Sequence, residues 1–76
     1  MRRTPVESSS LSSVGYDPER SLLELEFHGG RIYQYFAVPR RTFEELMTAA
    51  SVGAFVNRCI KPRFPFRRVE GRDSTQ

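Results

Sequence analysis

The stretch SLLELEFHGGRIYQY, residues 21–35, decides how this chain folds. Before the two glycines, apolar and acidic residues alternate, which puts Leu23, Leu25 and Phe27 on one face of a strand. The run after the glycines predicts the next strand. Because glycine adopts positive φ without steric cost, the pattern predicts an antiparallel hairpin.

The length of the hairpin loop decides which way the tyrosines face. A loop of the double glycine alone would place Leu25 on one face with Gln34 and waste a core position. A three-residue loop that includes the preceding histidine pairs Leu25 with Tyr33 and Leu23 with Tyr35. We therefore expect both tyrosines on the inner, helix-covered face. Facing outward, the same rings would form a stacking platform for bases.

The rest of the chain predicts one more strand and two helices. Residues from 8 to 17 lead into the hairpin as a strand, with a bulge between Leu11 and Val14 because their phases differ. Pro39 suits the first turn of a helix with apolar residues at helical spacing. Gly53 is expected to separate this helix from a second, short helix. Ser51 could cap the second helix, and Pro62 ends it.

These elements give an α+β fold: a small three-stranded antiparallel meander with two C-terminal helices packed on one face. A fourth strand at the edge is an alternative for the extended segment 63–69, which could also be a tail lying across the sheet. At 76 residues the chain has room for one domain. We expect a flexible N-terminal arm at 1–7, one domain at 8–69 and a flexible tail at 70–76.

Composition argues against several classes of protein. One cysteine and one histidine cannot form an internal disulfide or a zinc site, and no apolar run reaches the ~20 residues of a membrane span. We expect a cytoplasmic protein without membrane contact, cofactor or metal. Catalysis is not expected either. Cys59 is expected to be a small buried apolar residue, and His28 an exposed turn residue. The side chains of Glu44 and Glu45 are expected to point in different directions from one helix.

Positive charge is concentrated near the C-terminus. The net charge is +3, and residues 57–76 carry six Lys or Arg against two acids, with phenylalanines interleaved. Such a stretch can neutralise phosphates and stack on unpaired bases, which favours single-stranded RNA or tRNA as partner. The candidate nucleic-acid-binding residues are Arg58, Lys61, Arg63, Phe64, Arg67 and Arg68, with Tyr33 and Tyr35 as further candidates.

Two other interpretations stay open. The basic residues could form a solvated edge that keeps a small domain soluble. The domain could also bind a protein partner or dimerise through an apolar second face of the sheet. That face would contain Leu22, Ile32, Phe36 and Val38.

An ordered series of short motifs resembles a known family. It comprises Gly15-Tyr16-Asp17, LELEF ending at Phe27, a glycine before Tyr33-Gln34-Tyr35, Val38-Pro39, AASVGAFVN at 49–57, Ile60-Lys61 and Phe64-Pro65. The series is similar to the KTSC domain, found at the C-terminus of some lysyl-tRNA synthetases and as stand-alone small bacterial and phage proteins. The resemblance covers roughly residues 8–69, and its hallmark Tyr-x-Tyr is matched by the two tyrosines of the hairpin.

The resemblance implies an unknown function, with RNA binding suggested by the fusion to a synthetase. Two positions depart from the family pattern. Val56 stands where an aromatic is expected, and Phe64 stands where tyrosine is frequent. Since Phe64 lacks a hydroxyl, a role for this position in base recognition is weaker here.

Overall fold

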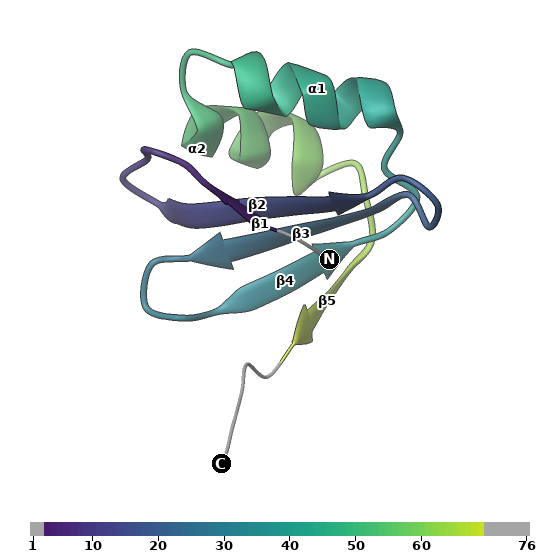
Figure 1. Ribbon diagram of the computed structural model, residues 1–76, viewed down its shortest axis with the longest axis horizontal. Coiled ribbons are helices and arrows are strands. Elements are labelled where there is room, and N and C mark those ends of the chain that lie inside the picture. The colour runs from purple at the N-terminus through teal and green to yellow at the C-terminus, as the bar shows by residue number, and fades with distance from the viewer. Residues whose placement is uncertain (1–2, 70–76) are drawn as a thin grey trace.

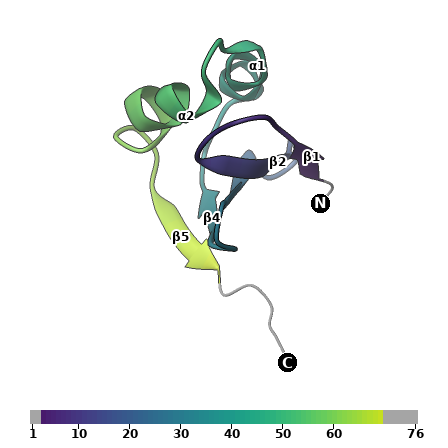
Figure 2. The same cartoon turned by 90° about the vertical axis from the view of Figure 1, so that its left-hand side faces the viewer.

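The computed structural model describes residues 3–69 as a five-stranded antiparallel sheet in the order β1-β2-β3-β4-β5. The strands are β1 (Arg3–Pro5), β2 (Leu11–Asp17), β3 (Leu22–Phe27), β4 (Ile32–Tyr35) and β5 (Phe66–Val69). Between β4 and β5 lie α1 (Arg40–Thr48), α2 (Val52–Phe55) and the π-helical turn η1 (Val56–Ile60). Both helices cover one face of the sheet, with β1 and β5 at opposite edges (Figures 1 and 2).

The α+β class, the meander and the one-sided helices are confirmed, but the expected number of strands was too small. The extended segment after the helices forms the edge strand β5, and β1 pairs with β2, with Arg3 opposite Gly15. Pro5 sits at this outer edge, where its missing N–H costs no ladder hydrogen bond. Thus three residues of the expected flexible arm at 1–7 are paired. Their mobility is untested, and the expected tail at 70–76 lies outside the described residues.

The hairpin has the register that the three-residue loop predicts. Leu23 pairs with Tyr35 and Leu25 with Tyr33. The Phe27 N–H donates to the Arg31 carbonyl oxygen at 2.8 Å, which closes the ladder at the loop. The two loop glycines have φ of 97° and 89°, conformations that side chains rarely adopt. The expected bulge is also present, because the β2–β3 register shifts between Leu11 and Ser13.

The core lies between the sheet and the helices. Leu46 of α1 and Val56 and Ile60 of η1 are almost fully buried against the inner face of the sheet. On that face they meet the side chains of Leu11, Val14, Leu23, Leu25 and Tyr35. Large apolar groups spaced along two helices therefore attach them to the sheet.

Gly53 does not separate the helices, contrary to expectation. The break falls at 49–51, and Ser51 caps α2 by accepting a hydrogen bond from the Ala54 N–H at 3.2 Å. Gly53 lies inside α2, where a Cβ would stand 3.3 Å from Ser10 Oγ. It therefore allows α2 to approach the segment before β2.

Within residues 3–69 no helix is long and apolar enough to cross a membrane.

The second face of the sheet differs from the apolar surface that the sequence suggested. Val38 belongs to the core, because Ala37 adopts φ of 61° and ends the alternation of β4. Leu22 and Ile32 are only 7% and 8% exposed. The rest of this face combines the half-buried Phe36 and Val69 with polar groups, where Gln34 Nε2 donates to Glu24 Oε1 at 3.0 Å. Ser13 donates similarly to Glu26, and Arg3 forms ion pairs with both glutamates.

Attachment of α1 to the sheet should depend on Leu46, the buried side chain of that helix. We expect Leu46→Ala to lower the free energy of unfolding by about 2–5 kcal/mol, since it removes apolar contacts and leaves a cavity. The neighbouring exposed substitution Glu45→Ala should change it by less than about 0.5 kcal/mol. Urea unfolding followed by circular dichroism measures both. Equal effects of the two substitutions would contradict this packing.

Candidate nucleic-acid interface

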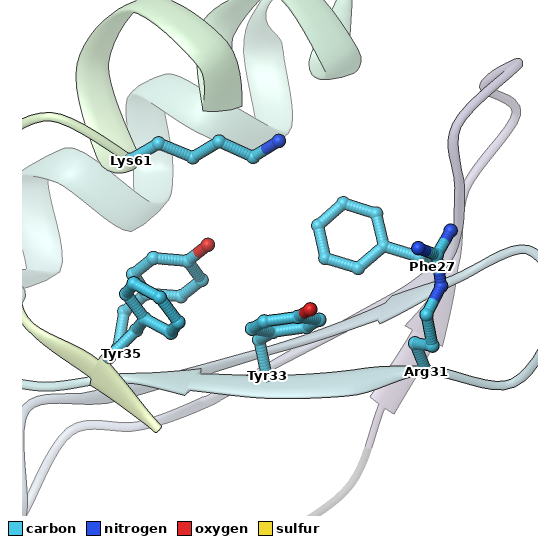
Figure 3. Close-up of a pocket in the computed structure, with 6 residues that line it drawn as sticks. Phe27, Arg31, Tyr33, Tyr35 and Lys61 are labelled. Carbon is cyan, nitrogen blue, oxygen red and sulfur yellow. The ribbon is translucent and has the colours of Figure 1, made fainter. Parts of the chain in front are cut away.

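A hollow of about 310 Å³ opens on the inner side of β4 and β5. We call it the aromatic hollow. Its lining comes from the end of β3, the hairpin loop, β4, β5 and the turn after η1 (Figure 3). The residues that line it are Phe27, Arg31, Tyr33, Tyr35, Lys61 and Phe66.

The hairpin register builds most of this hollow. Tyr33 and Tyr35 alternate along β4 and so point to one face, and Arg31, just before that strand, points the same way in Figure 3. Phe66 of β5 pairs with Tyr35 and extends the surface sideways. Lys61 follows the end of η1, and its side chain reaches over the hollow from the helix side (Figure 3).

The rings of the aromatic hollow form a continuous cluster. Phe27 meets Tyr33 edge to face, with 5.5 Å between ring centroids. Phe66 is tilted against both Tyr33 and Tyr35, at 5.5 and 5.6 Å. Phe66 is also the exposed large apolar side chain of the described region, with 56% of its surface accessible. This arrangement leaves an aromatic surface available to a planar ligand.

The hydroxyl of Tyr35 has an unusual position. The residue as a whole is only 2% exposed, but its hydroxyl lies at the hollow and makes no hydrogen bond to another residue of 3–69. Figure 3 shows the oxygen directed from the strand toward Lys61. Burial, together with the neighbouring Tyr33, raises the pKa of Tyr35 above its ordinary value. The group therefore stays neutral at physiological pH and is available to donate into the hollow.

The aromatic hollow carries positive charge without compensation. Arg31 and Lys61 take part in no ion pair among the residues described, and no carboxylate lines the hollow. The Lys61 ammonium lies 5.6 Å from the centre of the Phe27 ring, within cation–π range. Rings and two unpaired cations together suit a ligand that is both planar and anionic.

The structure distributes the sequence-predicted residues over several surfaces. Tyr33, Tyr35 and Lys61 meet in the aromatic hollow, and Arg68 pairs with Tyr33 on the same face of the sheet. Arg67 pairs with Gln34 and so lies on the opposite face.

The other three candidates lie outside the hollow. Phe64 is half-buried against the core, and Arg63 is exposed in the turn after η1. Arg58 borders a separate shallow depression beside Ala49 and Phe55. Their role in binding stays a prediction.

Sequence reasoning missed Phe27, Arg31 and Phe66 as site residues, although Phe66 was noted among the interleaved phenylalanines. A signal for the first two was present, because the three-residue loop already placed Phe27 opposite Arg31 next to the tyrosines. Phe66 could not be placed without knowing that the last segment pairs with β4.

Cys59 and His28, the residues considered for catalysis or metal binding, do not line the aromatic hollow. Cys59 is half-buried rather than buried, a correction to the expectation. His28 is exposed as expected, with Nδ1 3.0 Å from Ser12 Oγ and Nε2 2.9 Å from the Ser8 carbonyl oxygen. Across residues 3–69, no group of three His, Cys, Asp or Glu side chains could hold a metal.

Comparison with known proteins identifies the family. The family model of the KTSC domain matches residues 7–64 of the sequence. The chain belongs to the KTSC domain family. A KTSC domain protein from Yersinia pestis, known from a crystal structure, superposes with a TM-score of 0.85 at 42% identity and covers 90% of this chain and 96% of that one. The family match itself indicates no catalytic activity.

Relatives of this KTSC domain occur alone and within a larger enzyme. A protein from Tsukamurella paurometabola is 50% identical over 60 residues, 79% of this chain and 90% of its own length. An uncharacterised protein from Stutzerimonas stutzeri is 46% identical over 63 residues, 83% of this chain and 89% of its own length. A lysine–tRNA ligase from Nostoc is 38% identical over 63 residues, which is 83% of this chain but 11% of the ligase.

The raised pKa of Tyr35 predicts a loss of stability in alkali. Below its ordinary pKa of 10.0 the phenol is neutral in folded and unfolded chains alike. As the pH rises above that value, the unfolded chain ionises first, so the stability of the fold falls until the folded pKa is passed. Against Tyr35→Phe, the wild-type free energy of unfolding should fall by up to about 1.4 kcal/mol per pH unit. Urea titrations from about pH 8 to about pH 11.5 test this, and a constant difference would contradict it.

Proposed function

We propose that this KTSC domain is a non-catalytic binding module of the cytoplasm that recognises single-stranded RNA through the aromatic hollow. The carrying observation is the aromatic hollow itself, which joins exposed ring faces to two cations and has the Tyr35 hydroxyl directed into it. Since this hydroxyl makes no hydrogen bond to another residue of 3–69, it is available to a ligand. A bound base would offer it an acceptor.

The size and chemistry of the hollow support a base as its occupant. Its volume of about 310 Å³ is at the lower end of the range of small-molecule sites. This suits one ring system better than several stacked bases. Phe66 and Tyr33 offer faces for stacking, a contribution of about 1–3 kcal/mol per base. Arg31 and Lys61 stand where they can neutralise the adjoining phosphates.

The basic residues outside the hollow extend the proposed surface. Arg68 lies on the same sheet face as Tyr33, and Arg63 lies in the turn just beyond Lys61. In this proposal both help hold the strand that enters the hollow, whereas Arg67 faces away and contributes little. Three lysine–tRNA ligases carry a similar region, which supports a tRNA-related role in this proposal. An unpaired segment of tRNA is therefore one natural source of the ligand.

Docking of a protein through the second sheet face has less support. Val38 lies in the core, and Leu22 and Ile32 are already buried. The remaining surface of that face holds the Arg3, Glu24 and Gln34 network, whose groups are paired with one another. Phe36, the fourth apolar residue expected on this face, is half-buried, so the apolar surface left for a partner is small.

Binding should depend on salt and on the two cations of the hollow. Fluorescence anisotropy with a labelled single-stranded RNA should show affinity falling steeply as salt rises, and the double variant Arg31→Ala, Lys61→Ala should flatten the logarithmic slope by about 1.4. The control Arg20→Ala removes a cation 78% exposed and paired to Asp17, in the turn at the other end of the sheet (Figure 1). It should leave the slope unchanged. Absence of binding at low salt, or equal effects of both variants, would contradict the proposal.

A further inference from the structure

A second hollow of about 350 Å³ adjoins the aromatic one. The two share Phe27, Arg31 and Lys61, so they lie next to each other with the Phe27 ring between them. We call the second one the polar hollow. Its remaining lining comes from the segment before β2, the hairpin and the α2–η1 turn, and is mostly polar. No carboxylate lines it either.

The polar hollow presents hydrogen-bonding groups that the fold does not use. The side chains of Ser9, Ser10 and Asn57 are exposed there and bond to no other side chain or backbone group of residues 3–69. Gly53 lets Ser10 pack directly against α2, because a Cβ would stand 3.3 Å from its hydroxyl oxygen. Both ring nitrogens of His28, in contrast, are occupied by Ser8 and Ser12.

We infer that the two hollows together hold one ribonucleotide, with the base in the aromatic hollow and the ribose hydroxyls in the polar one. This inference rests on the proposed function and adds the sugar to it. Arg31 and Lys61 flank both hollows, so a phosphate on either side of the sugar meets a cation. Phe27, which separates the hollows, provides an apolar surface for the sugar ring as it passes from one to the other.

The lining of the polar hollow distinguishes RNA from DNA. A ribose 2′-hydroxyl both donates and accepts hydrogen bonds, and it is the group by which proteins separate the two nucleic acids. Serine hydroxyls and an asparagine amide can satisfy it in both senses. With deoxyribose, Ser9 and Asn57 would form hydrogen bonds to water instead, and their bonds to the sugar would be lost. One or two neutral hydrogen bonds correspond to a preference of about fivefold or more.

The test compares three strands of the same sequence, about ten nucleotides long: RNA, DNA with deoxyuridine in place of thymidine, and RNA with 2′-fluoro sugars. The fluoro sugar keeps the pucker of ribose but cannot donate. Anisotropy titrations should show wild-type protein binding RNA about fivefold or more tighter than either analogue. Ser9→Ala combined with Asn57→Ala should abolish the preference while leaving DNA affinity unchanged. Thr4→Ala, an exposed polar truncation at the far edge of the sheet, should keep the preference.

Each outcome has a distinct meaning. Equal binding of RNA and DNA overturns the inference but leaves the proposed function standing. A fluoro strand that binds as well as RNA shows that the pucker, not the hydroxyl, is read, and overturns it too. A preference that survives in the double variant also overturns the inference, because Ser9 and Asn57 then do not read the sugar. Absence of binding to all strands at low salt overturns the proposed function as well. Thermal unfolding checks that the variants, altered at exposed positions, remain folded.

Discussion

The pairing of Leu23 with Tyr35 and of Leu25 with Tyr33 is the constraint on which the rest of the molecule depends. Side chains alternate along a strand, so a slip of one residue would turn both tyrosines to the face that carries Glu24. The three-residue loop prevents that slip through two glycines at positive φ. Once the register is set, the inner face has enough apolar surface to hold the helices, and the outer face is left to charged pairs.

The same register creates the candidate site. It aligns Arg31 with the tyrosines and leaves Tyr35 under the turn that follows η1, with its hydroxyl directed into the hollow. A phenylalanine there would fill the core but could not donate a hydrogen bond to a ligand. The Phe66 ring is exposed beside it, and Arg31 and Lys61 form no ion pair within residues 3–69. These three features meet in one place, so the hollow, rather than the basic segment as a whole, is the better candidate for the binding site.

Sequence patterns were sufficient to predict the features that depend on a few neighbouring residues. The hairpin, the bulge after Leu11 and the Ser51 cap each follow from a few neighbouring residues. β1 was missed because three residues with a proline carry no alternation. Val38 was misplaced because nothing in the sequence signals the left-handed turn at Ala37. The site was only partly found, since counting charges along the chain cannot tell that β5 directs Arg67 and Arg68 to opposite faces.

The central claim is that the aromatic hollow receives a base from single-stranded RNA. Backbone and side-chain NMR spectra of the labelled domain, recorded during titration with such an RNA at low salt, test it most directly. The account predicts the largest shift changes at Tyr33, Tyr35 and Phe66, with a new hydrogen bond detected for the Tyr35 hydroxyl. Changes confined to the Glu24–Gln34 face, or spread over exposed cations while the hollow's rings stay unperturbed, would contradict it.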